Sequence, residues 1–106
     1  MDNSIRVRWS GGERTFLPGT VIHFGRDPGC DVQLANTNVS RRHAELEHTT
    51  SGWTLRDVGS AQGTWQNGGR TSSLLVSGAT SVSLGQPPKG EQLELVVAGS
   101  DDDPLV

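Results

Sequence analysis

The 106-residue sequence predicts an all-β domain, a β-sandwich of short strands, from three observations. Glycine occurs 14 times and proline five times, so turn-forming residues interrupt the chain at short intervals. Between them lie brief runs rich in β-branched residues, several of which alternate apolar and polar side chains. No segment keeps a helical period over three turns. About ten short strands at this spacing are typical of two packed antiparallel sheets.

The expected strands follow one another with turns or short loops between them. They cover residues 5–9, 13–17, 21–24, 31–34, 43–48, 53–58, 64–66, 74–76, 81–84 and 93–97. The first alternates as Ile-Arg-Val-Arg-Trp, and Ser-Gly-Gly, Pro-Gly and Asp-Pro-Gly turns follow the first three. Residues 35–42 are polar without a period and predict a loop, whereas Asn67-Gly68 is a strong hairpin turn signal.

The length predicts one domain, which we place at residues 1–98, followed by a flexible acidic tail or linker at 99–106. The formal net charge is −3, and the tail contains three consecutive aspartates. An acidic chain argues against broad nucleic-acid binding, which depends on a basic face. A small local anion site remains compatible with this balance.

The sequence favours a cytoplasmic location, either alone or as the cytosolic part of a membrane-associated protein. Its single cysteine, Cys30, allows no internal disulfide, which fits a reducing compartment. No N-terminal stretch has the pattern of a signal peptide, and no apolar run is long enough to span a membrane. We therefore expect no direct membrane contact by this domain.

Functional residue types gather in four short motifs within the expected loops. The motifs are Gly25-Arg26, Ser40-Arg41-Arg42-His43, Gly63-Thr64-Trp65 and Asn67-Gly68. The planar fork of arginine matches two phosphate oxygens, and a neighbouring serine hydroxyl can donate to the same phosphate. Three loop arginines beside a serine therefore predict a phosphate-binding site rather than a chemical step. The competing interpretation of Arg26 alone is a surface pair with Asp27 or Asp31.

The remaining motif residues divide between binding and support. His43 begins a strand and is expected to point inward, where it would tie the loop together by hydrogen bonds. Arg42 either joins the site or lies outward at its rim. The glycine-rich loop at 59–67 offers backbone amides, while Thr64 and Trp65 are expected to pack.

Taken in order, these motifs resemble the forkhead-associated (FHA) domain over roughly residues 5–97. Ser-x-x-His follows Gly-Arg by about fourteen residues, Gly-Thr lies about twenty further on, and Asn-Gly comes after it. The resemblance implies a β-sandwich of about eleven short strands with phosphothreonine-binding loops at one end. Such domains recognise phosphorylated motifs through arginine clusters.

The resemblance also implies roles for individual residues. Arg26 would contact the phosphate or the nearby peptide backbone, Ser40 would donate to the phosphate, and Arg41 would add charge. The residues expected to bind the phosphopeptide are Arg26, Ser40, Arg41, Arg42, Ala61 and Gln62. Those expected to support the site are Gly25, His43, Gly63, Thr64, Asn67 and Gly68.

Two positions depart from the family pattern, which usually has Thr-Asn before Gly-Thr. Ala61 offers only its backbone amide, and Gln62 keeps the amide group on a side chain one methylene longer. The usual asparagine holds the peptide main chain, so this replacement bears on affinity and on the preference after the phosphothreonine.

The resemblance implies a protein partner phosphorylated on threonine by an upstream serine/threonine protein kinase, and no cofactor. A second resemblance concerns the parent protein. The segments at 7–16 and 84–87 are similar to FHA segments at the N-terminus of actinobacterial ABC transporters.

Three alternatives remain. Ser40, His43 and Asp57 are the residue types of a hydrolytic triad, but residues 59–63 do not form a Gly-x-Ser-x-Gly elbow, so we expect no enzyme. The histidines and Cys30 lack paired metal-ligand spacing, so no metal site is expected. The third alternative is a phosphate-independent scaffold or intramolecular docking domain of a larger regulatory or transport protein.

Overall fold

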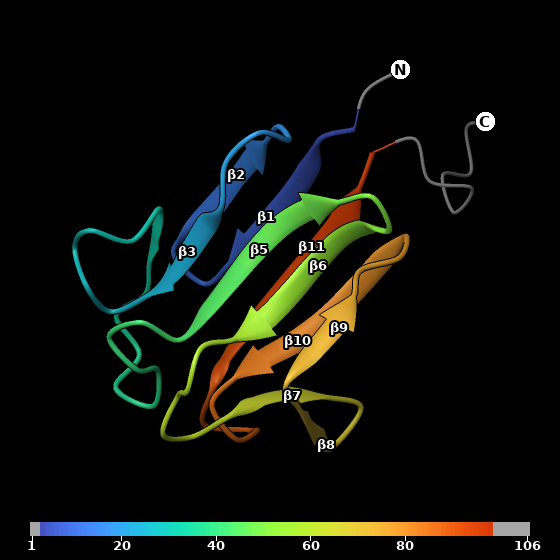
Figure 1. Cartoon of the computed structure of the whole chain (residues 1–106). Helices are drawn as coiled ribbons and strands as arrows, with labels where there is room; N and C mark the ends of the chain where they lie inside the picture. The colour runs from blue at the N-terminus through green and yellow to red at the C-terminus, as the bar shows by residue number, and fades with distance from the viewer. Residues whose placement is uncertain (1–2, 99–106) are drawn as a thin grey trace.

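The computed structural model describes residues 3–98, which form eleven strands and no helix (Figure 1). The strands are β1 (Ile5–Trp9), β2 (Gly12–Phe16), β3 (Ile22–Gly25), β4 (Val32–Gln33), β5 (Ala44–Thr49), β6 (Gly52–Asp57), β7 (Thr64–Gln66), β8 (Gly69–Thr71), β9 (Ser73–Leu75), β10 (Ala79–Leu84) and β11 (Glu91–Val97). The all-β prediction is confirmed.

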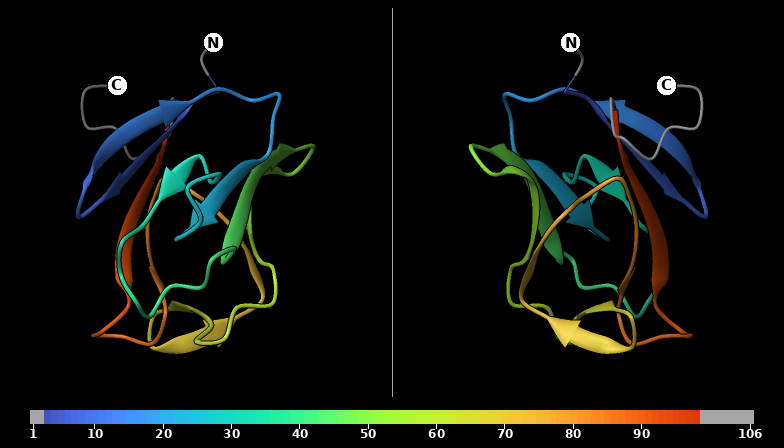
Figure 2. Two further views of the ribbon diagram at one scale, coloured as in Figure 1. Left: turned by 90° about the vertical axis from the view of Figure 1, so that its left-hand side faces the viewer. Right: turned by 90° about the vertical axis from the view of Figure 1, so that its right-hand side faces the viewer.

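The strands form two sheets that pack face to face (Figure 2). One sheet has six strands in the order β2-β1-β11-β10-β7-β8, and the other has five in the order β4-β3-β5-β6-β9. The short pair β3–β4 is parallel, and the other pairs are antiparallel. This is the expected two-layer sandwich.

Alternating side chains fill the space between the sheets. Ile5 and Val7 are fully buried, whereas the arginines between and after them face solvent. The largest fully buried side chain is Trp53 of β6, whose indole nitrogen donates to the carbonyl oxygen of Asn3 at 2.8 Å. Burying each large apolar side chain contributes about 1.5–3 kcal/mol, and the resulting core is a rigid support for the loops.

The strand missing from the sequence prediction is β8, whose Gly-Arg-Thr sequence carries no apolar alternation. It forms because the turn before it is strong. Asn67 and Gly68 have φ values of 53° and 79°, the paired positive angles of a type I′ hairpin turn. The turn brings β8 antiparallel to β7, with Trp65 opposite Arg70.

Strand ends also differ from the expectation near the loops. The expected strand at 31–34 shortens to Val32–Gln33, and His43 lies one residue before β5. The expected tail at 99–106 lies outside the described residues. Within 3–98, no helix is long and apolar enough to cross a membrane.

Candidate functional site

Three connections meet at one end of the sandwich, at the left and lower left in Figure 1: β3–β4, β4–β5 and β6–β7. Backbone hydrogen bonds join the first two. The amide of Arg26 donates to the carbonyl of Ser40, and the amide of Asp27 donates to that of Arg41, each at 3.1 Å. Gly25 permits this approach, because an added Cβ would overlap the carbonyl oxygen of Arg41. The Gly-Arg motif therefore places Arg26 directly beside the serine loop.

The side chain of Arg26 is anchored by one nitrogen only. Its Nε donates to the carbonyl oxygen of Val39 at 2.5 Å. The guanidinium has five N–H groups, so four remain for a ligand, and none of these is hydrogen-bonded to another residue within 3–98. Among residues 3–98 the competing pair of Arg26 with Asp27 or Asp31 does not form, and these two carboxylates accept the amides of Gly29 and His23, respectively.

Ser40 joins the β4–β5 and β6–β7 connections through its side chain. Its hydroxyl oxygen accepts the backbone N–H of Ala61 at 3.0 Å. No residue of the described chain accepts the hydroxyl proton, so this proton is available to an incoming anion. The accepted N–H also polarises the hydroxyl and holds it in place.

His43 is fully buried behind the serine, as the sequence predicts. Its Nδ1 accepts the backbone N–H of Ser40 at 3.1 Å, so the proton of the neutral ring lies on Nε2. Nε2 then donates to the carbonyl oxygen of Gly63 at 2.8 Å. Burial lowers the pKa of His43 below 6.5, despite the opposing effects of the Gly63 carbonyl and Asp57. A neutral imidazole thus connects the serine loop to the Gly-Thr motif.

Asp57 organises the neighbouring loop. Its Oδ1 accepts the amides of Gly59 and Ser60 at 2.8 Å each. Its Oδ2 accepts the hydroxyls of Ser60 at 2.5 Å and Thr64 at 2.8 Å. Partial burial raises the pKa of Asp57, but these hydrogen bonds outweigh it and hold the pKa below the usual 3.8. The carboxylate is therefore a structural anion that shapes the loop.

These contacts do not form a hydrolytic triad. A triad needs a histidine nitrogen hydrogen-bonded to the serine hydroxyl. Here the histidine accepts from the serine backbone amide, and its other nitrogen faces Gly63. The Oδ2 atom of Asp57 lies 3.8 Å from Nε2 of His43, and it accepts hydrogen bonds from other donors, the hydroxyls of Ser60 and Thr64.

Acidification is expected to destabilise the domain through His43. The unfolded chain binds a proton at His43 near pH 6.5, while the folded chain resists it, so stability present above that pH is lost as pH falls below it. The slope is up to about 1.4 kcal/mol per pH unit, measurable by urea unfolding from pH 7.5 to 5. His43→Gln should flatten this slope and His48→Gln should keep it. An equal slope in wild type and His43→Gln would contradict this assignment.

Ala61 and Gln62 lie exposed at the tip of the β6–β7 connection. The backbone carbonyl of Gln62 accepts the indole N–H of Trp65 at 2.8 Å, which fixes the loop onto β7. The Gln62 residue also lines an open hollow of about 360 Å³ with residues of the β4–β5 and β10–β11 connections, Asn38, Gln86, Pro87, Pro88 and Lys89.

Arg41 and Arg42 are both exposed, and Arg42 lies toward the β3–β4 turn. There its charge acts on Cys30, whose thiol donates to the carbonyl of Arg41 at 3.5 Å. Burial and the charge of Asp27 nevertheless raise the pKa of Cys30 above 9.0. Cys30 is therefore held as a thiol at neutral pH.

The sequence interpretation missed two residues of this region. Asp57 enters the sequence interpretation only as a triad member, although Asp-x-Gly-Ser is a sequence in which the carboxylate caps its own turn. Arg70 lies across Gly63, and no pattern near it in the sequence indicated that position.

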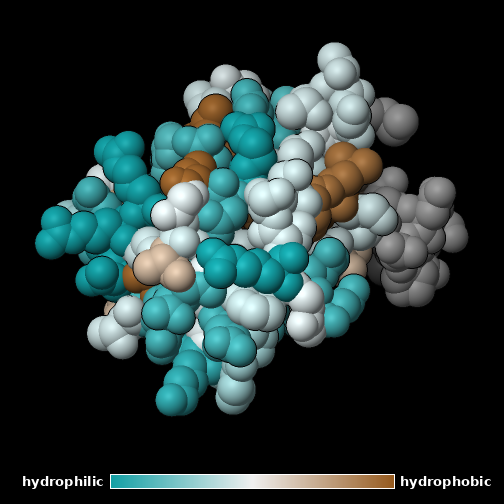
Figure 3. Space-filling model, turned by 60° about the horizontal axis from the view of Figure 1, so that its bottom comes forward, coloured by the Kyte–Doolittle hydropathy of each residue, from teal (hydrophilic) through white to brown (hydrophobic). Residues whose placement is uncertain are grey.

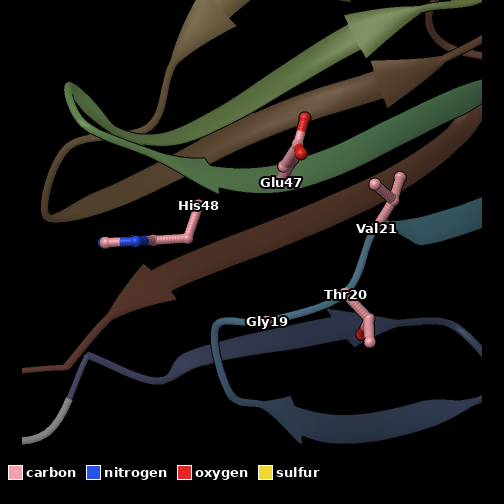
Figure 4. A pocket seen from close by; sticks show the side chains of 5 residues that line it. All are labelled: Gly19, Thr20, Val21, Glu47 and His48. Carbon is pink, nitrogen blue, oxygen red and sulfur yellow. The ribbon is translucent and has the colours of Figure 1, made fainter.

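The loop end is mostly hydrophilic, with a few small apolar spots (Figure 3). A separate hollow of about 160 Å³ lies between the β2–β3 connection and β5. In Figure 4 the side chains of Glu47 and His48 point apart, so their polar atoms do not converge on one ligand. Among residues 3–98, no group of three or more acidic, histidine or cysteine side chains could hold a metal ion.

Comparison with known families decides the assignment. The model of the FHA domain matches residues 22–85, which span the loops just described. The chain is an FHA domain. Such domains are protein-interaction modules that bind phosphothreonine-containing partners.

Two proteins of Mycobacterium tuberculosis are similar to this FHA domain. The ABC transporter ATP-binding/permease protein Rv1747 is 35% identical over 83 residues, 78% of this chain but 10% of the transporter. The glycogen accumulation regulator GarA is 33% identical over 75 residues, 71% of this chain and 46% of GarA. The chain thus spans a small part of the first and about half of the second.

A solved structure shows the same fold. The crystal structure of the FHA-1 domain of M. tuberculosis Rv1747 has a TM-score of 0.86 and 33% identity, covering 92% of this chain and 98% of that one. The eleven-stranded FHA sandwich implied by the resemblance is confirmed.

Proposed function

We propose that Arg26, Ser40 and the loop amide of Ala61 form the phosphate site of this FHA domain. The observation that carries the proposal is the Ser40 hydroxyl, which is fixed by Ala61 and retains a free proton beside the Arg26 loop. Four N–H groups of Arg26 and the hydroxyl of Ser40 could donate to one phosphate. Arg41 adds long-range charge, and Arg42 is a rim residue that contributes less.

The contacts are consistent with moderate affinity. Each hydrogen bond to a charged group contributes about 1.5–3 kcal/mol. Association and ordering cost several kcal/mol, so three such contacts with a few peptide contacts correspond to a Kd on the order of micromolar.

Ala61 and Gln62 adapt this site without removing it. The Ala61 amide binds Ser40 and therefore positions the hydroxyl, a role that needs no side chain. No residue within 3–98 hydrogen-bonds the Gln62 side chain, which could therefore bind the main chain of the peptide from the rim of its hollow.

The proposed setting is a cytosolic FHA segment, residues 1–98, within a larger protein of the ABC-transporter type. Its partner would be phosphorylated by a serine/threonine protein kinase. The domain would act by binding alone, without catalysis, a cofactor, nucleic acid or direct membrane contact. The sequence similarity to Rv1747 and the absence of triad geometry at Ser40 support this setting.

The test is titration of the domain with a degenerate phosphothreonine peptide library, beside unphosphorylated and phosphoserine libraries. Binding is expected for phosphothreonine alone, and Ser40→Ala should weaken it by at least about tenfold, since one charge-assisted contact is lost. Thr50→Ala, in the exposed turn between β5 and β6, is the matched control and should bind as wild type. Binding that ignores phosphate would instead identify a phosphate-independent docking domain.

Affinity should also fall as salt rises, because ions screen the exposed arginines from the dianion. The same titrations at low and high salt check this expectation. An affinity that does not change with salt would contradict the arginine site.

A further inference from the structure

Arg70 of β8 is held across the loop that carries Ala61 and Gln62. A Cβ added at Gly63 would lie 2.6 Å from Nε and 3.0 Å from Cζ of Arg70. The guanidinium group therefore packs against Gly63 on the side where any other residue would carry its Cβ, and the φ of this glycine is 86°. Such confinement reduces the entropy that an arginine loses on binding.

Arg70 is nevertheless exposed and forms no side-chain hydrogen bond or ion pair with any residue between 3 and 98. The neighbouring carboxylate, Asp57, is occupied by the two amides and two hydroxyls of its own loop. Arg70 and Asp57 line an open hollow of about 350 Å³ with Gly59, Thr71 and Ser72. A preplaced cation thus faces solvent in a recess lined in part by Gly59, which belongs to the same β6–β7 connection as Ala61.

We infer that Arg70 selects an acidic residue, Asp or Glu, in the phosphothreonine peptide. This inference rests on the proposed function and names a sequence preference for the same ligand. A carboxylate matches the guanidinium fork, and the hydroxyl-bearing rim of the hollow can accommodate its second oxygen.

The position of the acid follows from chain geometry. Ala61 hydrogen-bonds to Ser40, and Gly63 lies two residues further, at most about 7 Å along the chain. An extended peptide advances about 3.3 Å per residue. The acid recognised by Arg70 should therefore lie about two to four residues from the phosphothreonine.

A second cation, Lys89, allows an experiment to distinguish which side of the β6–β7 connection recognises the acid. Lys89 lines the other hollow, together with Gln62, while Arg70 lines the hollow with Gly59. Acid recognition through Arg70 predicts that Arg70→Gln removes the acid preference and that Lys89→Gln leaves it. Arg6→Gln, an exposed arginine on β1, serves as the charge-matched control.

The experiment uses the position at which a phosphothreonine library shows enrichment of Asp or Glu. Two peptides are then made, one with the acid and one with its amide, and Kd is measured by fluorescence polarisation. Wild type and Arg6→Gln should bind the acid peptide about 2- to 10-fold more tightly, in the range of an exposed charge-assisted pair. Arg70→Gln should bind both peptides alike while melting at the wild-type temperature.

Three outcomes would overturn the inference. They are phosphothreonine binding without any acid preference, an acid preference that persists in Arg70→Gln, and a preference lost in Lys89→Gln instead. These results leave the phosphate site standing. If wild type binds no phosphothreonine peptide, both this inference and the proposed function fail, so the two failures are distinguishable.

Discussion

Replacing Arg26 with alanine is expected to reduce phosphothreonine-peptide affinity by at least about 100-fold, which corresponds to two lost charge-assisted contacts. The guanidinium is anchored within the loop framework through the Val39 carbonyl, and the Arg26 side chain is otherwise exposed. Its loss also removes a positive charge from beside the serine loop, to which the Arg26 backbone amide is hydrogen-bonded. Fluorescence polarisation with a phosphothreonine peptide measures the effect.

Arg26→Lys separates charge from geometry. Lysine keeps the charge but lacks the planar fork, so affinity should recover only in part. The Arg26 side chain also binds the Val39 carbonyl, and the melting temperature of each variant must therefore be recorded. A stable Arg26→Ala domain that binds phosphopeptide normally would contradict the site.

The second large effect is expected from Gly25→Ala, a change of one methyl group. That methyl would overlap the carbonyl oxygen of Arg41 and lie 2.7 Å from its carbonyl carbon. Both are backbone atoms, and the same carbonyl accepts the amide of Asp27, so the loop cannot yield without losing that bond. We expect the free energy of unfolding to fall by about 3 kcal/mol, at the upper end for overpacking, and phosphopeptide binding to fall with it.

Gly69→Ala is the matched control for this change. Its Cβ would lie 3.7 Å from the carbonyl oxygen of Gln66, an ordinary contact. Urea unfolding should therefore show little change for Gly69→Ala. Equal stabilities for the two variants would show that the close approach at Gly25 is not needed.

The strands could be predicted from the sequence where one face is buried, because apolar and polar residues then alternate along the strand. In β1, Ile5 and Val7 are buried between exposed arginines, so local sequence and tertiary packing agree. β8 lacks such alternation, because its residues lie at the sheet edge and its position depends on the preceding turn. Sequence periodicity therefore could not identify β8, whereas Asn67-Gly68 could have.

The candidate site was predictable as a set of residue types but not as a network. Loop arginines and a serine indicated phosphate, because their chemistry does not depend on exact placement. The bond from Ala61 to Ser40 joins loops 21 residues apart, and no local pattern encodes it. The position of Arg70 over Gly63 likewise depends on the β7–β8 pairing rather than on neighbouring residues.

The pairing of β1 with β11 has a consequence for how this domain is connected. Ile5 lies opposite Val97, so the two ends of the described sandwich are neighbours, about 5 Å apart between Cα atoms. β11 begins at Glu91 beside the loop end, so its other end lies at the far pole of the molecule. A tether at either terminus therefore leaves the loops unobstructed, and the domain could be inserted into a surface loop of a host protein with its recognition end pointing outward.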